Sequence, residues 1–267
     1  MKLLPDTLTI IQKFIQTRVS EADAKGVVLG LSGGVDSATA LSLAVSALGS
    51  DSVKGLIMPF KPSESIDLAL NHAKSLDVET KEYKIHSIVD SYKEISNSYL
   101  SKASEGNLHS RIRMSLLYGE AFSSNCLVLG TSNKSEILVG YYTKWGDGAS
   151  DLLPMGDLYK SQIYTIAKDL EIPIDILDRV PTAELWEGQS DEEDLGISYS
   201  SLDKILLGLE KQFSTDELSK STGIDSESID RISNLVNLAI HKRVFPPVCK
   251  IGRRTVGFDW RETIGSK

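Results

Sequence analysis

The sequence predicts an α/β protein in which helices flank both faces of a doubly wound parallel sheet. Short apolar segments alternate with helix-like segments through the first half of the chain. The apolar segments lack in–out alternation, which is typical of strands that are buried on both faces of a parallel sheet. The chain has 267 residues, 41% hydrophobic and 25% charged, and a chain of this length buries a substantial core.

The first half of the chain can be assigned element by element. Apolar residues at helical spacing predict an amphipathic helix over 6–24. Strands and helices are then expected to alternate, as strand 27–32, helix 36–48, strand 53–60, helix 63–76 and strand 78–85. The helix over 36–48 is almost wholly apolar, so we expect it to be buried on most sides. The last strand has a polar alternation, which indicates an edge position.

The second half is predicted to be richer in helices. We expect helices over 87–100 and 107–123, a buried strand over 126–131, a short helix over 133–139, and helices over 159–171, 199–210 and 225–243. Residues 140–157 form an irregular segment, and loops longer than about 12–15 residues are uncommon unless they have a function. Ligands of such sheets bind at the carboxyl ends of the strands, which directs attention to the residues after 27–31 and 126–130.

Charge and composition exclude several classes of protein. The net charge of −8 argues against a broad nucleic-acid surface, which needs clustered positive charge. No segment has the roughly 18 apolar residues that a membrane helix needs, and the first residues do not resemble a signal peptide. Two cysteines exclude a disulfide scaffold, and we expect a cytoplasmic location.

The most specific signal is a turn between the first strand and an apolar helix. It consists of Gly30, Leu31, Ser32, Gly33, Gly34, Val35, Asp36 and Ser37. Two glycines let the backbone approach a ligand, and successive amides at a helix N-terminus form an anion cradle. It is neither a Walker A loop nor a dinucleotide fingerprint. An aspartate in an anion cradle indicates a bridging cation, so we interpret Asp36 as a Mg²⁺ ligand. The alternative is a tight turn in which Asp36 or Ser32 caps the helix.

The segment Ser32–Ser37 resembles the SGGxDS loop of the N-type ATP pyrophosphatases, which split ATP between the α- and β-phosphates and adenylate an oxygen of the substrate. That motif alone does not choose among NAD synthetase, GMP synthetase, asparagine synthetase and the tRNA-modifying enzymes.

Further segments, in order along the chain, resemble those of ammonia-dependent NAD synthetases. They are NLHSRIRM at 107–114, LGTSNKSE at 129–136, GYYTKWGDGASD at 140–151, PTAEL at 181–185, QSDE at 189–192, LGISY at 195–199 and HKR at 241–243. The resemblance implies one domain over 1–267 with an adenine nucleotide alpha hydrolase-like, Rossmann-like fold. Its pyrophosphatase core would span about 26–185, and a C-terminal helical part about 198–245.

The resemblance also implies roles for residues outside the loop. Thr131, Lys160 and Thr182 match ATP-binding positions, and Glu136 would complete the Mg²⁺ site with Asp36. Each has an ordinary alternative: Thr131 and Thr182 as helix caps, Glu136 and Lys160 as solvent-facing residues of helix surfaces.

A second set matches the binding positions for deamido-NAD. It comprises Arg111, Lys144, Asp151, His241 and Lys242. His241 and Lys242 also lie at the end of a predicted helix, where basic residues favour the helix dipole. Asp151 either polarises ammonia as a catalytic residue, together with Asp36 and Lys160, or simply binds substrate.

The implied reaction starts with attack of the nicotinate carboxylate on the α-phosphorus of ATP. Ammonia then displaces AMP and gives NAD⁺. The 26 residues before the first strand are too few for a glutaminase domain, and neither Cys126 nor Cys249 has an evident acid–base partner. We therefore expect free ammonia as the nitrogen source, with a separate glutaminase subunit as the alternative. The family implies a homodimer, for which helices 107–123 and 225–243 are candidate surfaces. A tRNA-modifying enzyme and a non-catalytic nucleotide-binding module are the alternatives.

Overall fold

Four parallel strands form the sheet in a computed structural model of the chain, which describes residues 2–96, 101–182, 186 and 188–255. The strands are β1 (Val27–Gly30), β2 (Val53–Ile57), β3 (Glu79–Glu82) and β4 (Leu127–Val128). Their order is β3-β2-β1-β4, and every neighbouring pair is parallel. The predicted parallel sheet and the edge position of the third strand are confirmed. Each strand is shorter than predicted, since only part of each predicted segment pairs with a neighbouring strand.

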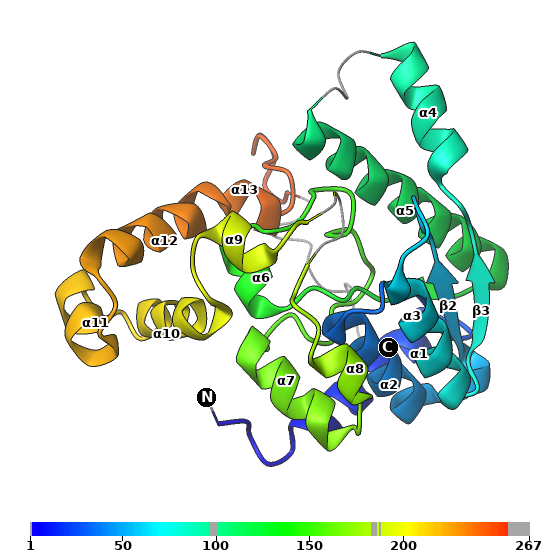
Figure 1. Cartoon of the computed structure of the whole chain (residues 1–267), viewed down its shortest axis with the longest axis horizontal. Coiled ribbons are helices and arrows are strands. Elements are labelled where there is room, and N and C mark those ends of the chain that lie inside the picture. The colour runs from blue at the N-terminus through cyan, green and yellow to red at the C-terminus, as the bar shows by residue number, and fades with distance from the viewer. Residues whose placement is uncertain (1, 97–100, 183–185, 187, 256–267) are drawn as a thin grey trace.

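Helices cover both faces of this sheet (Figure 1). One apolar cluster joins the strands to α1 (Thr7–Glu21), α2 (Val35–Leu48), α3 (Glu64–Ser75), α7 (Lys160–Asp169) and α8 (Ile174–Leu177). The opposite face packs against α4 (His86–Ile95) and α5 (Lys102–Ser124). A short 3₁₀ helix, η1 (Ser50–Ser52), leads into β2. The doubly wound arrangement is therefore confirmed.

Strand β1 explains why the apolar runs show no alternation. Val27, Val28 and Leu29 all have 0% exposure. Val27 and Leu29 belong to the cluster on one face, whereas Val28 belongs to the cluster on the other. Since successive side chains point to opposite faces, a strand covered on both sides must be apolar at every position.

A separate helical unit follows the sheet. It contains α9 (Asp191–Leu195), α10 (Tyr199–Glu210), α11 (Thr215–Thr222), α12 (Ser226–Leu238) and α13 (Ile240–Arg243). These helices have an apolar cluster of their own, which also includes Val139 of α6 (Lys134–Val139) and Tyr159. Figure 1 shows the unit on the side of the molecule away from β2 and β3, with α6 and α7 between.

Several predicted boundaries were wrong. The helix expected over 225–243 is two helices, because α12 ends at Leu238, Ala239 is its C-cap, and α13 begins at Ile240. The helix expected from 107 starts at Lys102, where the Ser101 side chain caps it by accepting from the Ser104 amide. Helix α4 ends at Ile95, and residues 97–100 of the predicted helix lie outside the described residues. Three short helices, α8, α9 and α11, were not predicted.

The irregular segment 140–157 is confirmed, and it is packed against the rest of the protein. Its one regular contact is an isolated parallel bridge between Leu152 and Leu129, which continues the line of β4. The Thr143 hydroxyl donates to Asn107 Oδ1 of α5 at 2.6 Å. This segment therefore lies where β4 and α5 meet. Within the described residues, no helix is both long and apolar enough to cross a membrane.

Candidate active site

The turn after β1 holds its own shape through serine hydroxyls. Ser37 Oγ lies 3.1 Å from Ser32 Oγ and donates to the Gly34 carbonyl at 3.0 Å. The Gly34 amide donates to Ser32 Oγ at 3.2 Å. Gly34 itself is the N-cap residue of α2 and makes no side-chain cap bond, so neither Asp36 nor Ser32 caps this helix. The amides of the first turn of α2 are thus available to an anion.

Gly33 is required for this turn. Its φ is +77°, in the left-handed region that side chains disfavour. A Cβ atom there would lie 2.2 Å from the Ser65 carbonyl oxygen at the start of α3. The backbone of the loop and the backbone of α3 are therefore in direct contact.

Three of the predicted site residues converge beside this turn. Lys160 Nζ, at the start of α7, lies 2.5 Å from Asp36 Oδ2 and 3.4 Å from Glu136 Oε1. Lys160 is only 2% exposed, and the side chain of Glu136 is 15% exposed. The alternative interpretations of Glu136 and Lys160 as solvent-facing residues were therefore wrong.

Asn133 connects the two carboxylates and was missed by the sequence reasoning. It is fully buried and caps α6, accepting from the Glu136 amide with Oδ1, while Glu136 Oε2 accepts from the Asn133 amide. Its Nδ2 donates to Asp36 Oδ1 at 2.9 Å. Asn133 thus holds both carboxylates: Glu136 through the capping box, and Asp36 through its side-chain amide group. The pattern Asn133-x-x-Glu136 is a recognisable capping signature, and it also excludes Thr131 as the cap of α6.

The charges of this cluster depend on one another. Burial by itself lowers the pKa of Lys160, but the negative charges of Asp36 and Glu136 outweigh it and raise that pKa above its ordinary value. Burial, and then the charge of Asp36, raises the pKa of Glu136, against the opposing effect of Lys160. A cation between the two carboxylates favours their ionised forms.

The donor set fits Mg²⁺. Two carboxylates approach a single ammonium group, so they are close enough to share one cation. Among the described residues there is no cluster of three or more His, Cys, Asp or Glu side chains that would hold a metal by itself. Mg²⁺ is commonly held by one or two carboxylates together with phosphate oxygens of a substrate, which is the arrangement that Asp36 and Glu136 offer.

A tyrosine and an aspartate close the other side of Lys160. The ammonium group lies 4.9 Å from the ring centroid of Tyr199 on α10. The Tyr199 hydroxyl donates to Asp191 Oδ2, and Tyr141 donates to Asp191 Oδ1, both at 3.1 Å. Burial raises the pKa of Asp191, although Lys160 and the two hydroxyl donors oppose it. The helical unit thus supplies one wall of the site.

The two other threonines predicted to contact ATP lie in different places: Thr131 at the expected strand end, and Thr182 in the segment after α8. Thr131 is half-buried and follows the Leu129 bridge that extends β4. Thr182 is half-buried, and residues 183–185 of the predicted PTAEL segment lie outside the described residues. Arg179, which the sequence reasoning did not select, donates from Nη1 to the Gly33 carbonyl at 3.1 Å. The sequence signal that could have identified Arg179 is its position as a basic residue shortly before Thr182, a predicted ATP contact.

The cations predicted to bind the dinucleotide form a second group around 140–157. Lys144 Nζ donates to the His241 carbonyl at 2.6 Å, and Arg111 Nη2 donates to the Lys144 carbonyl at 3.4 Å. Lys242 Nζ donates to the carbonyls of Gly140 and Tyr142, at 2.6 and 2.7 Å. The structure brings these four residues together, and Lys242 also satisfies the carbonyl of Gly140, the C-cap residue of α6.

Asp151 lies within the same segment, next to Leu152, which forms the bridge to Leu129. Its Oδ2 accepts from the Val128 amide at 2.7 Å, and its Oδ1 accepts from the Tyr118 hydroxyl at 3.3 Å. Asp151 is exposed, so it can reach a ligand while it holds the edge of β4. Its catalytic role stays a prediction.

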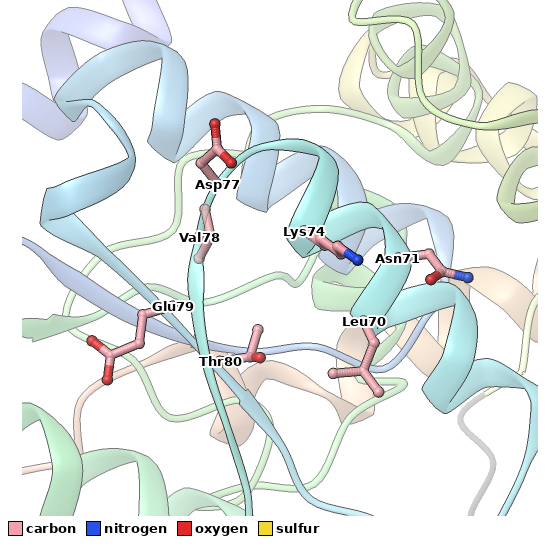
Figure 2. Close-up of a pocket in the computed structure, with 7 residues that line it drawn as sticks. All are labelled: Leu70, Asn71, Lys74, Asp77, Val78, Glu79 and Thr80. Atoms are coloured by element: carbon pink, nitrogen blue, oxygen red, sulfur yellow. The ribbon is translucent and has the colours of Figure 1, made fainter.

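An open surface hollow of about 540 Å³ lies elsewhere, between the end of α3 and the start of β3 (Figure 2). Figure 2 shows the side chains of Asp77, Glu79 and Lys74 pointing in different directions. It lies at the amino end of β3, whereas Asp36, Glu136 and Lys160 gather beyond the carboxyl ends of β1 and β4. The hollow therefore has no part in this site.

Comparisons with known proteins support one family. The sequence model of the family described as NAD synthase matches residues 7–246. The NH(3)-dependent NAD(+) synthetase of Archaeoglobus fulgidus is 47% identical over 241 residues, which cover 89% of this chain and 94% of that protein.

Two solved structures are similar over nearly the whole chain. The NMN synthetase of Francisella tularensis superposes with a TM-score of 0.83 at 31% identity, covering 94% of this chain and 100% of that one. The NH3-dependent NAD synthetase of Campylobacter jejuni superposes with a TM-score of 0.78 at 36% identity, covering 92% and 98%.

Proposed function

Because this chain belongs to the NAD synthase family, it is an ATP-dependent ligase that amidates deamido-NAD to NAD⁺, and we propose that free ammonia supplies the nitrogen through a Mg²⁺-assisted acyl-adenylate. The relative from Archaeoglobus fulgidus, named for its dependence on NH(3), is matched over 94% of its length. The observation that carries the proposal is the convergence of Asp36, Glu136 and Lys160 beside the glycine-containing turn.

The first half of the reaction needs a site for the pyrophosphate leaving group. The amides at the start of α2 and the ammonium group of Lys160 are the donors we assign to the phosphates. Mg²⁺, held by Asp36 and Glu136, would neutralise charge on the leaving pyrophosphate. Ser32 and Ser37 hold the turn in shape for this anion. No side chain needs to form a covalent bond with substrate, since the nicotinate carboxylate itself attacks the α-phosphorus.

The second half needs deamido-NAD beside the ATP. We assign its binding to Arg111, Lys144, Asp151, His241 and Lys242. Four of these are joined through backbone carbonyls of 140–157 and of His241. Cations around a phosphate-bearing dinucleotide are what charge complementarity requires. Thr131 and Thr182 complete the proposed ATP contacts.

The Francisella tularensis structure supports a second candidate substrate. That protein is named an NMN synthetase, and its fold matches this chain with a TM-score of 0.83. A mononucleotide acceptor uses the same adenylation chemistry, but it offers one phosphate and no second nucleoside to the cations of 140–157. We favour deamido-NAD, because the Archaeoglobus fulgidus relative, which is 47% identical, is named an NAD(+) synthetase, whereas the Francisella tularensis protein is 31% identical.

The test is a purified-protein assay with ATP, Mg²⁺ and ammonium, in which deamido-NAD and nicotinate mononucleotide are compared as acceptors. Equal yields of NAD⁺, AMP and pyrophosphate with deamido-NAD would support the proposal, and glutamine in place of ammonium should give no product. A higher kcat/KM for the mononucleotide would overturn the choice of acceptor. Pyrophosphate release without amide formation would overturn ammonia as the nitrogen donor.

We also propose a homodimer and a cytoplasmic location. Helix α5 exposes Phe122 at 92%, and the α12–α13 region exposes Leu238 at 73% and Ile240 at 49%. These side chains lie on the two predicted surfaces, and burying them against a second copy of the chain would remove apolar area from water. Cys126 and Cys249 are free thiols, which suits a reducing compartment. Sedimentation of Phe122→Asp beside wild type tests the dimer, since a variant that still sediments as a dimer would exclude α5.

A further inference from the structure

A buried carboxylate on α10 contacts the two helix starts that carry Glu136 and Lys160. Asp203 is 1% exposed. Its Oδ1 accepts from the Ser135 hydroxyl at 2.5 Å, and its Oδ2 accepts from the Ser161 amide at 2.8 Å. Ser135 precedes Glu136 on α6, and Ser161 follows Lys160 on α7.

The same carboxylate also reaches the backbone of Lys160 through Ser135. The Lys160 amide donates to Ser135 Oγ at 3.0 Å, and Ser135 is itself fully buried. The first two amides of α7 are therefore satisfied by one chain of contacts that ends on Asp203. A negative charge at the N-terminus of a helix is stabilised by the helix dipole, and burial strengthens such charge-assisted bonds.

Asp203 belongs to the C-terminal helical unit, whereas Asp36 lies in the first turn of α2, which packs on the sheet. Without the Ser135 and Ser161 contacts, α6 and α7 would keep their apolar packing but would lose the polar contact that fixes their starts relative to each other. Those starts decide where Glu136 Oε1 and Lys160 Nζ lie, and these two atoms are 3.4 Å apart.

We propose that Asp203 is a positioning residue for ATP cleavage: it fixes the starts of α6 and α7 so that Glu136 and Lys160 meet Asp36 at the phosphates. The proposal rests on the proposed roles of Glu136 and Lys160. It makes the C-terminal helical unit a part of the ATP site, although Asp203 itself touches no reacting atom.

Glu210 provides a matched control on the same helix. It accepts from Lys134 Nζ at 2.9 Å and from the Tyr159 hydroxyl at 2.6 Å, so it also joins α10 to α6 and to the residue before α7. Its side chain is 52% exposed, and no hydrogen bond described for it involves Ser135, Lys160 or Ser161. A role limited to docking α10 predicts similar effects for both carboxylates, whereas a positioning role predicts an effect at Asp203 alone.

The experiment compares Asp203→Asn and Glu210→Gln with the wild-type chain. Calorimetry measures binding of the Mg²⁺ complex of α,β-methylene-ATP, which is not cleaved, and steady-state kinetics give KM for MgATP and for ammonium. In Asp203→Asn we expect the Kd of the analogue and the KM for MgATP to rise about 10–100-fold, as for other residues that orient a ligand group. The KM for ammonium and both constants of Glu210→Gln should stay within about threefold of wild type. If Asp203→Asn were only less completely folded, its overall rate would fall while its KM and Kd stayed at wild-type values, so these constants separate misfolding from positioning.

Wild-type Kd and KM in folded Asp203→Asn would overturn the proposal, and so would equal losses in Glu210→Gln. If Asp203→Asn does not fold, Ser135→Ala takes its place. We expect a smaller rise in the Kd of the analogue for this variant, and an unchanged Kd would overturn the proposal. A wild-type chain that binds the analogue but forms no amide would contradict the proposed function alone, because the binding comparison still measures the effect of Asp203.

Discussion

The ammonium group of Lys160 lies 2.5 Å from a carboxylate oxygen of Asp36, although 124 positions separate the two residues in the chain. Asp36 comes from the turn after β1, and Lys160 comes from the start of α7. Lys160 is almost completely buried, with 3% side-chain exposure, and Asp36 is partly buried, with 19%. Removing either partner leaves a charge in a dry site, so both stability and activity should respond to substitution here.

Substitution of Asp36 should abolish ATP cleavage. Asp36→Asn keeps the size of the side chain but removes a proposed Mg²⁺ ligand and the partner of Lys160. We expect pyrophosphate release to fall by about 10²–10³-fold or more. Asp157→Asn is the control, since Asp157 is a 95% exposed partner of Lys134 and should retain wild-type activity. Full activity in Asp36→Asn would remove Asp36 from the proposed metal site.

Removal of Lys160 should make the protein respond more strongly to Mg²⁺ alone. In Lys160→Met, Asp36 and Glu136 face each other without the ammonium group, so we expect a loss of about 3–5 kcal/mol of unfolding free energy. MgCl₂ should then raise the melting temperature of the variant more than that of wild type, because no lysine competes for the carboxylates. KCl at equal ionic strength controls for screening. If MgCl₂ raises the melting temperature of both proteins equally, Mg²⁺ and the Lys160 ammonium group do not occupy the same position between Asp36 and Glu136.

Gly33→Ala should destabilise the protein more than the strain of a positive φ by itself would, because the added Cβ also meets the backbone of α3. Its Cβ would lie 2.2 Å from the Ser65 carbonyl at a φ of +77°. Gly49→Ala is a matched control, with a φ of +81° and nothing within 4 Å of the added atom. We expect Gly49→Ala to cost about 1 kcal/mol with normal kcat. Gly33→Ala should cost more and raise the KM for ATP. Urea unfolding and initial rates measure both, and similar behaviour of the two variants would show that the contact with α3 has no role.

Lys242 should contribute to stability as well as to substrate binding. Its ammonium group donates to the Gly140 and Tyr142 carbonyls, and hydrogen bonds to a charged group are worth about 1.5–3 kcal/mol each. Because Lys242 is half-buried, we expect Lys242→Met to lose about 1–3 kcal/mol of unfolding free energy without any ligand. His241→Ala keeps the carbonyl that Lys144 uses, so it should unfold like wild type. If Lys242→Met unfolds like wild type, Lys242 does not stabilise the fold and only its proposed role in substrate binding remains.

His109 should make the folded state sensitive to mild acid. Burial, and then the charge of Arg113, lowers the pKa of His109 from 6.5 to about 4. Among the described residues neither ring nitrogen has a hydrogen-bond partner, and the ring packs 4.3 Å from Phe60. The unfolded chain binds a proton below about pH 6.5 and the folded one does not, so stability falls as the pH drops from about 6.5 to about 4.

The measurement is the unfolding free energy in urea at pH 7 and at pH 5. Between these two values, wild type should lose about 2 kcal/mol more than His109→Leu, which cannot titrate at this position. The other titrating groups are common to both proteins and cancel in this difference. Parallel losses in wild type and variant would show that His109 is accessible to protons in the folded state.

The sequence alone determined the fold class and the position of the loop. The three residues Val27, Val28 and Leu29 are apolar because both faces of β1 are covered, and the pattern therefore revealed the sheet. The tight turn at Gly33 could be predicted from the sequence because its backbone conformation leaves no room for a side chain. Boundaries such as Ala239 were missed, since the apolar pattern continues across the break between α12 and α13.

Only the tertiary structure decided which of the predicted residues meet. Local patterns reach about one helical turn, so the most they could have indicated here is the Asn133–Glu136 cap, which the sequence analysis missed. The contacts of Asp36 with Asn133 and Lys160 depend on how β1, α6 and α7 are brought together. The same holds for Asp203, whose spacing on α10 suggests only a buried helix position. Apolar patterning is repeated along a chain and can be read from it, but a buried polar contact is a single pairing whose partners are chosen by the packing of the whole fold.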